Sequence, residues 1–361
     1  MEQRKVHGLT RRLGLAGLLG ASAMALTGCT VTPPDNAFFN ALRMGWPKGI
    51  TPEAHDTGNF WVWTWVAAWI IGIIMWVLMF VVIFRDSDKA HARRGNKDEF
   101  PRQTGYNVPL ELGLTTVPVL IIMALFFFNV QVQDKATALD KDPQVKVDVT
   151  AFQWNWKFGY SEIKAGLSPS GKDYEGIDEK AQEAAEKTKY EDGEHGPIHG
   201  KSKGDLSYLH YNKIETVGST EEIPVLVLPS HTAIQFDLAS ADVVHSFWVP
   251  EFLFKRDAFP HPAENRSERL FQIEEIQEEG AFVGRCAEMC GTYHAMMNFE
   301  VRVVSPEKFK QYIEFRQKNP QAPNSEALKS IGEDPYATST KPFVSDRKGS
   351  RDGQTVERSD A

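Results

Sequence analysis

Two long hydrophobic runs dominate the N-terminal third of this 361-residue chain. The first, residues 60–84 (FWVWTWVAAWIIGIIMWVLMFVVIF), carries no charge, and the second covers residues 112–130. About 20 apolar residues in a helix cross the ~30 Å hydrocarbon layer of a bilayer. The runs therefore predict transmembrane helices at 60–84 and 112–131. Two buried helices of a soluble core are the alternative.

The segment between the two runs, residues 85–111, is short and basic. Its six cationic residues are Arg85, Lys89, Arg93, Arg94, Lys97 and Arg102. Short loops rich in Lys and Arg remain on the cytoplasmic side of a membrane. The sequence therefore predicts a helical hairpin in the cell membrane, with segment 29–59 and everything after residue 131 exported.

Residues 1–28 have the layout of a secretory signal. Basic residues extend to Arg12, an apolar stretch follows, and small residues precede Cys29. The run LTGC resembles a bacterial lipobox, so we expect Cys29 to be the lipidated first residue of the mature chain. An unmodified cysteine behind an ordinary signal is the alternative.

The exported part begins with a strand-like pattern. Residues 145–151 (VKVDVTA) alternate apolar and polar side chains, as a half-buried strand does. The parity then changes, because Phe152, Trp154, Trp156 and Phe158 occupy even positions. Either a bulge re-aims the chain or the aromatic side chains lie on the face opposite the valines.

Further short strands, separated by turn residues, continue to about residue 304. They predict a β-sandwich or a Greek-key barrel over residues 143–304. An acid-rich stretch at about 162–220 interrupts it, and we interpret this stretch as an insertion with too few apolar residues for a second core. Residues 305–361 predict one amphipathic helix and a polar tail. The net charge of -8 argues against nucleic acid as a partner.

The run CAEMCGTYHAMM, residues 286–297, concentrates candidate metal ligands. Exported thiols often oxidise, and the C-x3-C spacing permits a disulfide. Zinc sites favour C-x2-C spacing and have no use for a thioether. Thiolate, imidazole and a weak methionine form the ligand set of copper electron-transfer sites. Two cysteines indicate two copper ions bridged by both sulfurs.

A copper pair needs a second histidine from elsewhere in the chain. His245, in ADVVHSFWVP, is the best candidate, because it ends a strand-like segment where a loop could meet residues 286–297. His261 lies among prolines and His231 lies in a predicted turn, so both are less well placed.

With these motifs the sequence resembles subunit II of the haem–copper cytochrome c oxidases, over roughly residues 55–305. The cysteine-rich run is similar to the family's dinuclear copper-A motif, and the block around His245 to the one with the upstream histidine. The resemblance implies a cupredoxin-like sandwich. It also implies these ligands for the two copper ions: His245, Cys286, the main-chain carbonyl of Glu288, Cys290, His294 and Met297.

The resemblance implies further roles for three residues. The Glu288 carboxylate would hold a magnesium or manganese ion at the boundary with subunit I. Trp154 would receive electrons from cytochrome c, which favours an outward-facing aromatic patch. Glu111 would stand at the cytoplasmic mouth of a proton pathway, whereas the residues alone favour a solvated carboxylate at a helix start.

The implied function is electron transfer from cytochrome c to the haem of subunit I, where oxygen is reduced and protons are pumped. The implied partners are subunits I and III and cytochrome c. The insertion and lipobox resemble those of actinobacterial oxidases, in which a cytochrome c domain belongs to a bc-type complex. A quinol oxidase subunit would lack the copper ligands, and a metal-storing lipoprotein would not need two spans. Nitrous-oxide reductases, which also carry a dicopper centre, lack the membrane hairpin.

Overall fold

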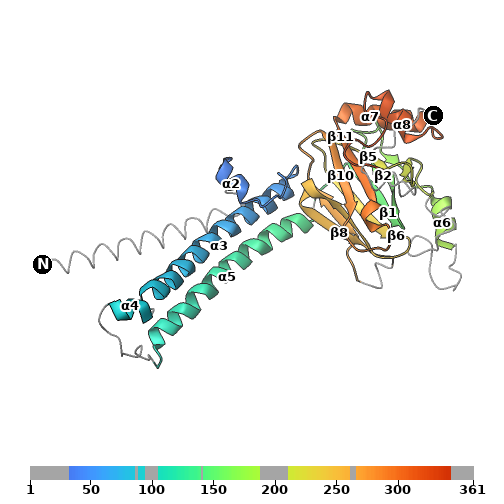
Figure 1. The fold of residues 1–361 in the computed structure, drawn as a ribbon. Coiled ribbons are helices and arrows are strands. Elements are labelled where there is room, and N and C mark those ends of the chain that lie inside the picture. The colour runs from blue at the N-terminus through green and yellow to red at the C-terminus, as the bar shows by residue number, and fades with distance from the viewer. Residues whose placement is uncertain are drawn as a thin grey trace. The chain divides into compact units, whose positions relative to one another are not determined.

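The computed structural model describes residues 32–85, 88–93, 105–139, 141–187, 210–260 and 266–342. Figure 1 shows its helices and strands. The chain divides into two units, a helical unit (Met1–Trp46 and Asp56–Asp134) and a β unit (Pro47–His55 and Lys135–Ala361). The predicted signal and the predicted lipidation site, Cys29, lie outside the described residues.

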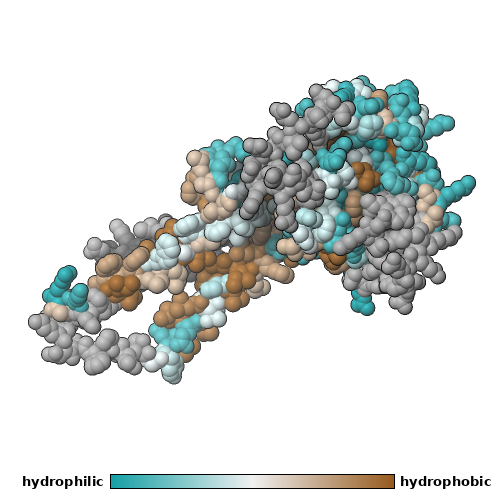
Figure 2. All heavy atoms as spheres, turned by 45° about the vertical axis from the view of Figure 1, so that its right-hand side comes forward, coloured by the Kyte–Doolittle hydropathy of each residue, from teal (hydrophilic) through white to brown (hydrophobic). Residues whose placement is uncertain are grey.

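The helical unit contains two long apolar helices. Its elements are α2 (Ala37–Ala41), α3 (Pro52–Arg85), α4 (Asp88–Arg93) and α5 (Val108–Thr137). The most apolar stretches of α3 and α5 have mean hydropathies of 2.8 and 2.2, and no residue in them is buried. Figure 2 shows hydrophobic side chains along both helices. Both are long and apolar enough to cross a bilayer, so the predicted hairpin of two apolar helices is confirmed.

Helix α5 begins four residues before the predicted span. Asn107 caps it, because the Leu110 N–H donates to the Asn107 side-chain oxygen at 3.3 Å. The Glu111 carboxylate accepts a hydrogen bond from the Asn107 N–H at 3.0 Å. Glu111 is thus an exposed residue of the first helical turn, and the helix continues through Pro118.

The β unit is a sandwich of two sheets. The first sheet has the strand order β3-β2-β1-β6-β9, with β4 also paired to β2, and the second has the order β5-β11-β10-β7-β8. Two pairings, β1 with β6 and β11 with β5, are parallel. The strands are β1 (Val145–Phe152), β2 (Asn155–Ile163), β3 (Tyr174–Glu175), β4 (Glu215–Val217), β5 (Val225–Pro229), β6 (Ile234–Ser240), β7 (His245–Val249), β8 (Phe254–Ala258), β9 (Leu270–Ile273), β10 (Gly280–Cys286) and β11 (Asn298–Val304). The predicted β-sandwich is confirmed.

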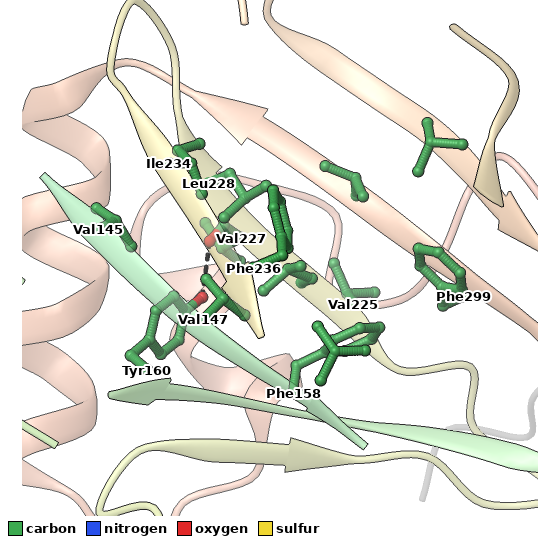
Figure 3. Packing of buried hydrophobic residues seen from close by; sticks show 14 of the residues in the cluster. Val145, Val147, Phe158, Tyr160, Val225, Val227, Leu228, Ile234, Phe236 and Phe299 are labelled. Carbon is green, nitrogen blue, oxygen red and sulfur yellow. Dashed lines mark hydrogen bonds between the residues drawn. The ribbon is translucent and has the colours of Figure 1, made fainter. Parts of the chain in front are cut away.

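A single core fills the space between the sheets. Alternating valines of β1 face it, as the sequence pattern predicts. Figure 3 shows Val147 beside Tyr160, its partner on the neighbouring strand β2. The Tyr160 hydroxyl donates to the Val227 carbonyl at 2.7 Å and so ties β2 of the first sheet to β5 of the second (Figure 3).

The parity change after residue 151 has a simple cause. Strand β1 ends at Phe152, Gln153 and Trp154 make a turn, and β2 returns antiparallel from Asn155. The turn resets the alternation, so Trp156 and Phe158 point into the core and are at most 1% exposed. The expected outward-facing aromatic patch is therefore wrong for these two residues. Trp154, in the turn, is half-buried.

The described ends of the insertion cover the outer face of the first sheet. They contain β3, β4 and helix α6 (Glu179–Lys187). The Lys157 ammonium lies 3.5 Å from the ring centre of Tyr211 and donates to the Asn212 side-chain carbonyl. Asn212 in turn donates to the Asp148 carboxylate at 2.8 Å. Burial lowers the pKa of Lys157 to about 8, although Asp148 and Glu215 oppose the shift.

The C-terminal segment is more ordered than a polar tail. After α7 (Pro306–Lys318) comes a second helix, α8 (Asn324–Ser330), which buries Ala327 and Leu328 in the main core. The polar-tail prediction was wrong here, because a few well-spaced apolar residues suffice for a short helix that packs on an existing core. The rest of the predicted tail, from residue 343, lies outside the described residues.

A buried ion pair holds the chain beyond α8. Arg302 contacts the Glu300 carboxylate at 2.5 Å and donates to the Asp334 and Tyr336 carbonyls. The other Glu300 oxygen accepts bonds from the Thr338 and Ser339 N–H groups, both at 2.7 Å. Two neighbouring residues of β11 therefore fasten the C-terminal segment to the sandwich.

Candidate metal centre

Three neighbouring strands of the second sheet bring the predicted ligands together. His245 opens β7, and Cys286 ends β10 opposite Phe247 of β7. The chain then loops through a 3-10 turn, η5 (His294–Met296), into β11. The Cys286 N–H donates to the Met297 carbonyl at 3.1 Å and closes the base of this loop.

The two cysteines are free thiols with their sulfurs 3.8 Å apart. The structure therefore has no disulfide between Cys286 and Cys290, contrary to that alternative. The His245 Nδ1 atom lies 3.8 Å from the Cys286 sulfur. Ligand atoms of His245, Cys286 and Cys290 all lie within 4.8 Å of one another, and all three residues are buried. This is a group that could hold a metal ion.

The remaining predicted copper donors border the same two sulfurs. The Cys290 sulfur lies 3.5 Å from His294 Nδ1 and 3.9 Å from the Met297 sulfur. The Cys286 sulfur lies 3.2 Å from the main-chain carbonyl of Glu288, whose side chain is exposed. Sulfur and imidazole donors therefore lie close together, and these are the ligand types of copper electron-transfer sites.

The two thiols hold one proton between them. A hydrogen bond from Cys290 lowers the pKa of Cys286 to about 3; burial opposes this shift, and His245 assists it. The pKa of Cys290 is raised, because its proton is held by the Cys286 sulfur and because it is buried. Two thiolates this close need positive charge between them, which a metal ion supplies, since a coordinating thiol is deprotonated outright.

Asp242 sets the orientation of His245. Its carboxylate lies 2.8 Å from His245 Nε2, so the hydrogen there points to Asp242 and Nδ1 remains free to face Cys286. Burial lowers the pKa of His245, but the bonds to Asp242 and Cys286 outweigh burial and leave it above its ordinary value. The second Asp242 oxygen accepts a bond from the Gln153 N–H at 2.6 Å.

Trp154 contacts the ligand loop directly. Its indole N–H donates to the Cys290 carbonyl at 3.0 Å, and the Gln153 side-chain amide donates to the same oxygen at 2.8 Å. The Tyr293 ring packs edge-on against the indole, with ring centres 4.9 Å apart. Gly291 has a φ of +118°, and a Cβ there would lie 3.2 Å from the indole. The turn between β1 and β2 and the ligand loop thus fit closely.

Sequence reasoning missed some of this network. It singled out Trp154 but not Gln153 or Tyr293, and it gave Asp242 no role beside His245. The only available signal was position, since each is a polar or aromatic neighbour of a selected residue. Of the less favoured histidines, His231 is exposed and pairs with Glu275 at 3.0 Å, and His261 lies outside the described residues.

The fold and the site together define a class of protein, a membrane-anchored β-sandwich with a candidate copper site. The protein has two apolar helices followed by a β-sandwich, and the sandwich gathers the thiolate, imidazole and thioether donors typical of copper electron-transfer sites. A family profile described as "Cytochrome C oxidase subunit II, periplasmic domain" matches residues 207–304.

Curated relatives cover almost the whole chain. Cytochrome c oxidase subunit 2 of Corynebacterium diphtheriae is 64% identical over 98% of this chain and 98% of that protein. The Corynebacterium glutamicum protein of the same name is 62% identical over 99% of both. The solved periplasmic domain of subunit II of cytochrome oxidase from Bradyrhizobium japonicum is 23% identical, covers 49% of this chain and 96% of that one, and has a TM-score of 0.29.

The chain belongs to the cytochrome c oxidase subunit 2 family, which confirms the resemblance found in the sequence. It is a subunit of a cytochrome c oxidase. It is also a membrane protein whose β unit lies outside the cytoplasm.

Proposed function

We propose that this chain is the electron-accepting subunit of its oxidase. It takes electrons from cytochrome c, or from a cytochrome c domain of a bc-type complex, and delivers them to the haem of subunit I. Oxygen is reduced there, and the reaction is coupled to proton pumping. The observation that carries the proposal is the hydrogen bond from Trp154 to the Cys290 carbonyl, which joins a half-buried indole to the buried thiols.

Six groups of this chain would hold a dinuclear copper-A centre. These donors are the sulfurs of Cys286, Cys290 and Met297, the imidazoles of His245 and His294, and the main-chain carbonyl of Glu288. When bound, the copper pair would supply one-electron redox chemistry. Burial of the two sulfurs, which are 7% and 3% exposed at the residue level, keeps water from these donors.

Trp154 is the residue through which electrons leave cytochrome c. Its half-buried indole presents a ring to a docking partner while its N–H is bonded to the ligand loop. Asp242 keeps the His245 ring fixed, so that a ligand atom does not rotate away during turnover. The protein thereby holds the Trp154 indole and the His245 imidazole in fixed positions before an electron arrives.

Further roles concern the surroundings of the centre. The exposed Glu288 carboxylate would hold magnesium or manganese at the contact with subunit I. Glu111 would accept protons at the cytoplasmic end of α5, beside the cap that it makes with Asn107. Cys29 would carry the lipid that anchors the mature N-terminus. The complex would lie in the cell membrane, with this chain crossing twice and subunit III completing it.

Paramagnetic resonance of the purified full-length chain loaded with copper tests the proposal. One unpaired electron shared equally by two copper ions is the expected signal. Cys290→Ser should abolish the sharing, whereas Thr292→Ala, at an exposed position of the same loop, should leave it intact. A single-copper spectrum, or a silent zinc form, in the unchanged chain would refute the proposal.

A further inference from the structure

Tyr293 lies in the chain between two candidate copper ligands, Cys290 and His294. It follows Cys290 by three residues and directly precedes His294. Its main-chain carbonyl accepts the Met296 N–H at 2.9 Å and so belongs to the turn that presents His294 and Met297. The backbone of Tyr293 is therefore part of the ligand loop.

The ring of Tyr293 has a different contact. It meets the Trp154 indole edge-on, with ring centres 4.9 Å apart and planes at 88°. Edge-to-face aromatic pairs are directional, because the positive edge of one ring faces the negative face of the other. The contact therefore restrains the tilt of the indole as well as its distance.

Several residues of the ligand loop therefore contact Trp154. Its N–H is bonded to Cys290, and Gly291 offers no side chain where a Cβ would lie 3.2 Å from the ring. Tyr293 supplies an edge-on aromatic contact. Without the Tyr293 ring, the indole could rotate about its side-chain bonds, and the bond to the Cys290 carbonyl would lengthen.

We propose that Tyr293 is a positioning residue for electron uptake: its ring holds the Trp154 indole in the orientation that keeps the N–H on the Cys290 carbonyl. The proposal rests on the proposed function of Trp154 as the electron-accepting residue. Tyr293 itself neither binds the metal nor exchanges electrons. Its effect is geometric, and small displacements from a productive geometry are costly.

Variants of the complete oxidase test this role. Tyr293→Leu removes the ring, Tyr293→Phe keeps it, and Thr292→Ala is the control at the exposed neighbouring position. Three quantities are measured: the rate of electron uptake at saturating reduced cytochrome c, the half-saturating cytochrome concentration, and the copper resonance signal. Amide hydrogen exchange of the segment 151–156 gives a fourth measurement that does not depend on activity.

For Tyr293→Leu we expect an uptake rate about tenfold lower, which is within the roughly 100-fold loss that a misplacement of about 1 Å can cause. The half-saturating concentration and the copper signal should stay unchanged, and residues 151–156 should exchange faster. Tyr293→Phe and Thr292→Ala should match the unchanged enzyme in all four measurements.

Several results would overturn the proposal. Normal uptake with Tyr293→Leu would do so, as would equally slow uptake with Tyr293→Phe, because the ring would then not be the active feature. A changed half-saturating concentration at a normal rate would make Tyr293 a docking residue. Loss of the copper signal in Tyr293→Leu would show that Tyr293 supports the ligand loop and does not act by positioning Trp154. Absence of the shared-electron signal in the unchanged enzyme is a separate result and would refute the proposed function instead.

Discussion

The indole nitrogen of Trp154 and the carbonyl oxygen of Cys290 lie 3.0 Å apart and share a hydrogen bond. The two residues come from different sheets: Trp154 from the β1–β2 turn of the first, and Cys290 from the loop after β10 of the second. The bond therefore depends on how the sheets pack, and the same core that stabilises the domain also sets this contact.

Trp154→Phe should slow electron uptake while the copper site persists. Phenylalanine retains an aromatic ring beside Tyr293 but has no N–H for the Cys290 carbonyl. We expect uptake from cytochrome c to fall about tenfold, as for a misplaced reacting group, with an unchanged copper resonance signal. Trp248→Phe, at a half-buried tryptophan of β7, is the control. Unchanged uptake in Trp154→Phe would show that the hydrogen bond has no part in the transfer.

Asp242→Asn should weaken metal binding. The amide can present its N–H₂ to His245 Nε2 and favour the opposite ring tautomer, which places a hydrogen on Nδ1. Loss of such an outer partner typically lowers metal affinity by about 10–100-fold. Competition with a copper chelator measures the loss, and Asp237→Asn, whose carboxylate pairs with Arg269, is the control. Equal affinities in the two variants would exclude the orienting role.

Arg302→Met should destabilise the β unit and release its C-terminal segment. Removal of one partner of a buried ion pair costs about 3–5 kcal/mol, because the other charge stays buried. Glu300 is fully buried, and Arg302 also holds the Asp334 and Tyr336 carbonyls. Chemical denaturation should show the lower free energy of unfolding, and proteolysis should cut beyond α8. Lys308→Met, at the more exposed partner of Glu333, should change the free energy by no more than about 1 kcal/mol.

The buried Lys157 predicts a pH effect on stability. Its pKa falls from 10.5 in an unfolded chain to about 8 in the folded one, mainly through burial. Between these values the unfolded chain holds a proton that the folded chain has lost, so stability rises with pH, by up to about 1.4 kcal/mol per unit. Below pH 8 both states are protonated and the effect disappears.

The effect is measured by difference. The free energy of unfolding of the unchanged protein minus that of Lys157→Met should rise between pH 8 and about 9.5. Burial raises the pKa of the neighbouring Tyr211, so its titration acts in the opposite direction above about pH 10. A difference that is flat or falling across the lower window would contradict the assigned state of Lys157.

Much of the fold follows from local pattern. Uninterrupted apolar runs predict α3 and α5, and the alternating valines predict β1, because each pattern is repeated over many residues. The direction of Trp156 could not be predicted this way, since two turn residues reset the alternation. Helix α8 was missed because its apolar residues are too few to form a periodic signal by themselves.

The candidate ligands were accessible from the sequence because they are rare residue types at short spacing. His245 was found through its motif, and the structure brings it to the sulfurs by strand pairing. The bonds of Asp242 were not predictable, because the bond to His245 depends on the conformation of the β6–β7 turn and the bond to Gln153 on contact with the distant β1–β2 turn. Sequence patterns thus identify metal donors better than the groups that orient them.

The cover that Tyr211 and Asn212 form over Lys157 has a practical consequence. Burial lowers the pKa of the Lys157 amine to about 8 and at the same time shields it from acylating reagents in solution. Acylation of Lys157 would therefore require that Tyr211 and Asn212 uncover it. Lys157 lies three residues from Trp154, so its acylation would report on the sheet close to the proposed docking site.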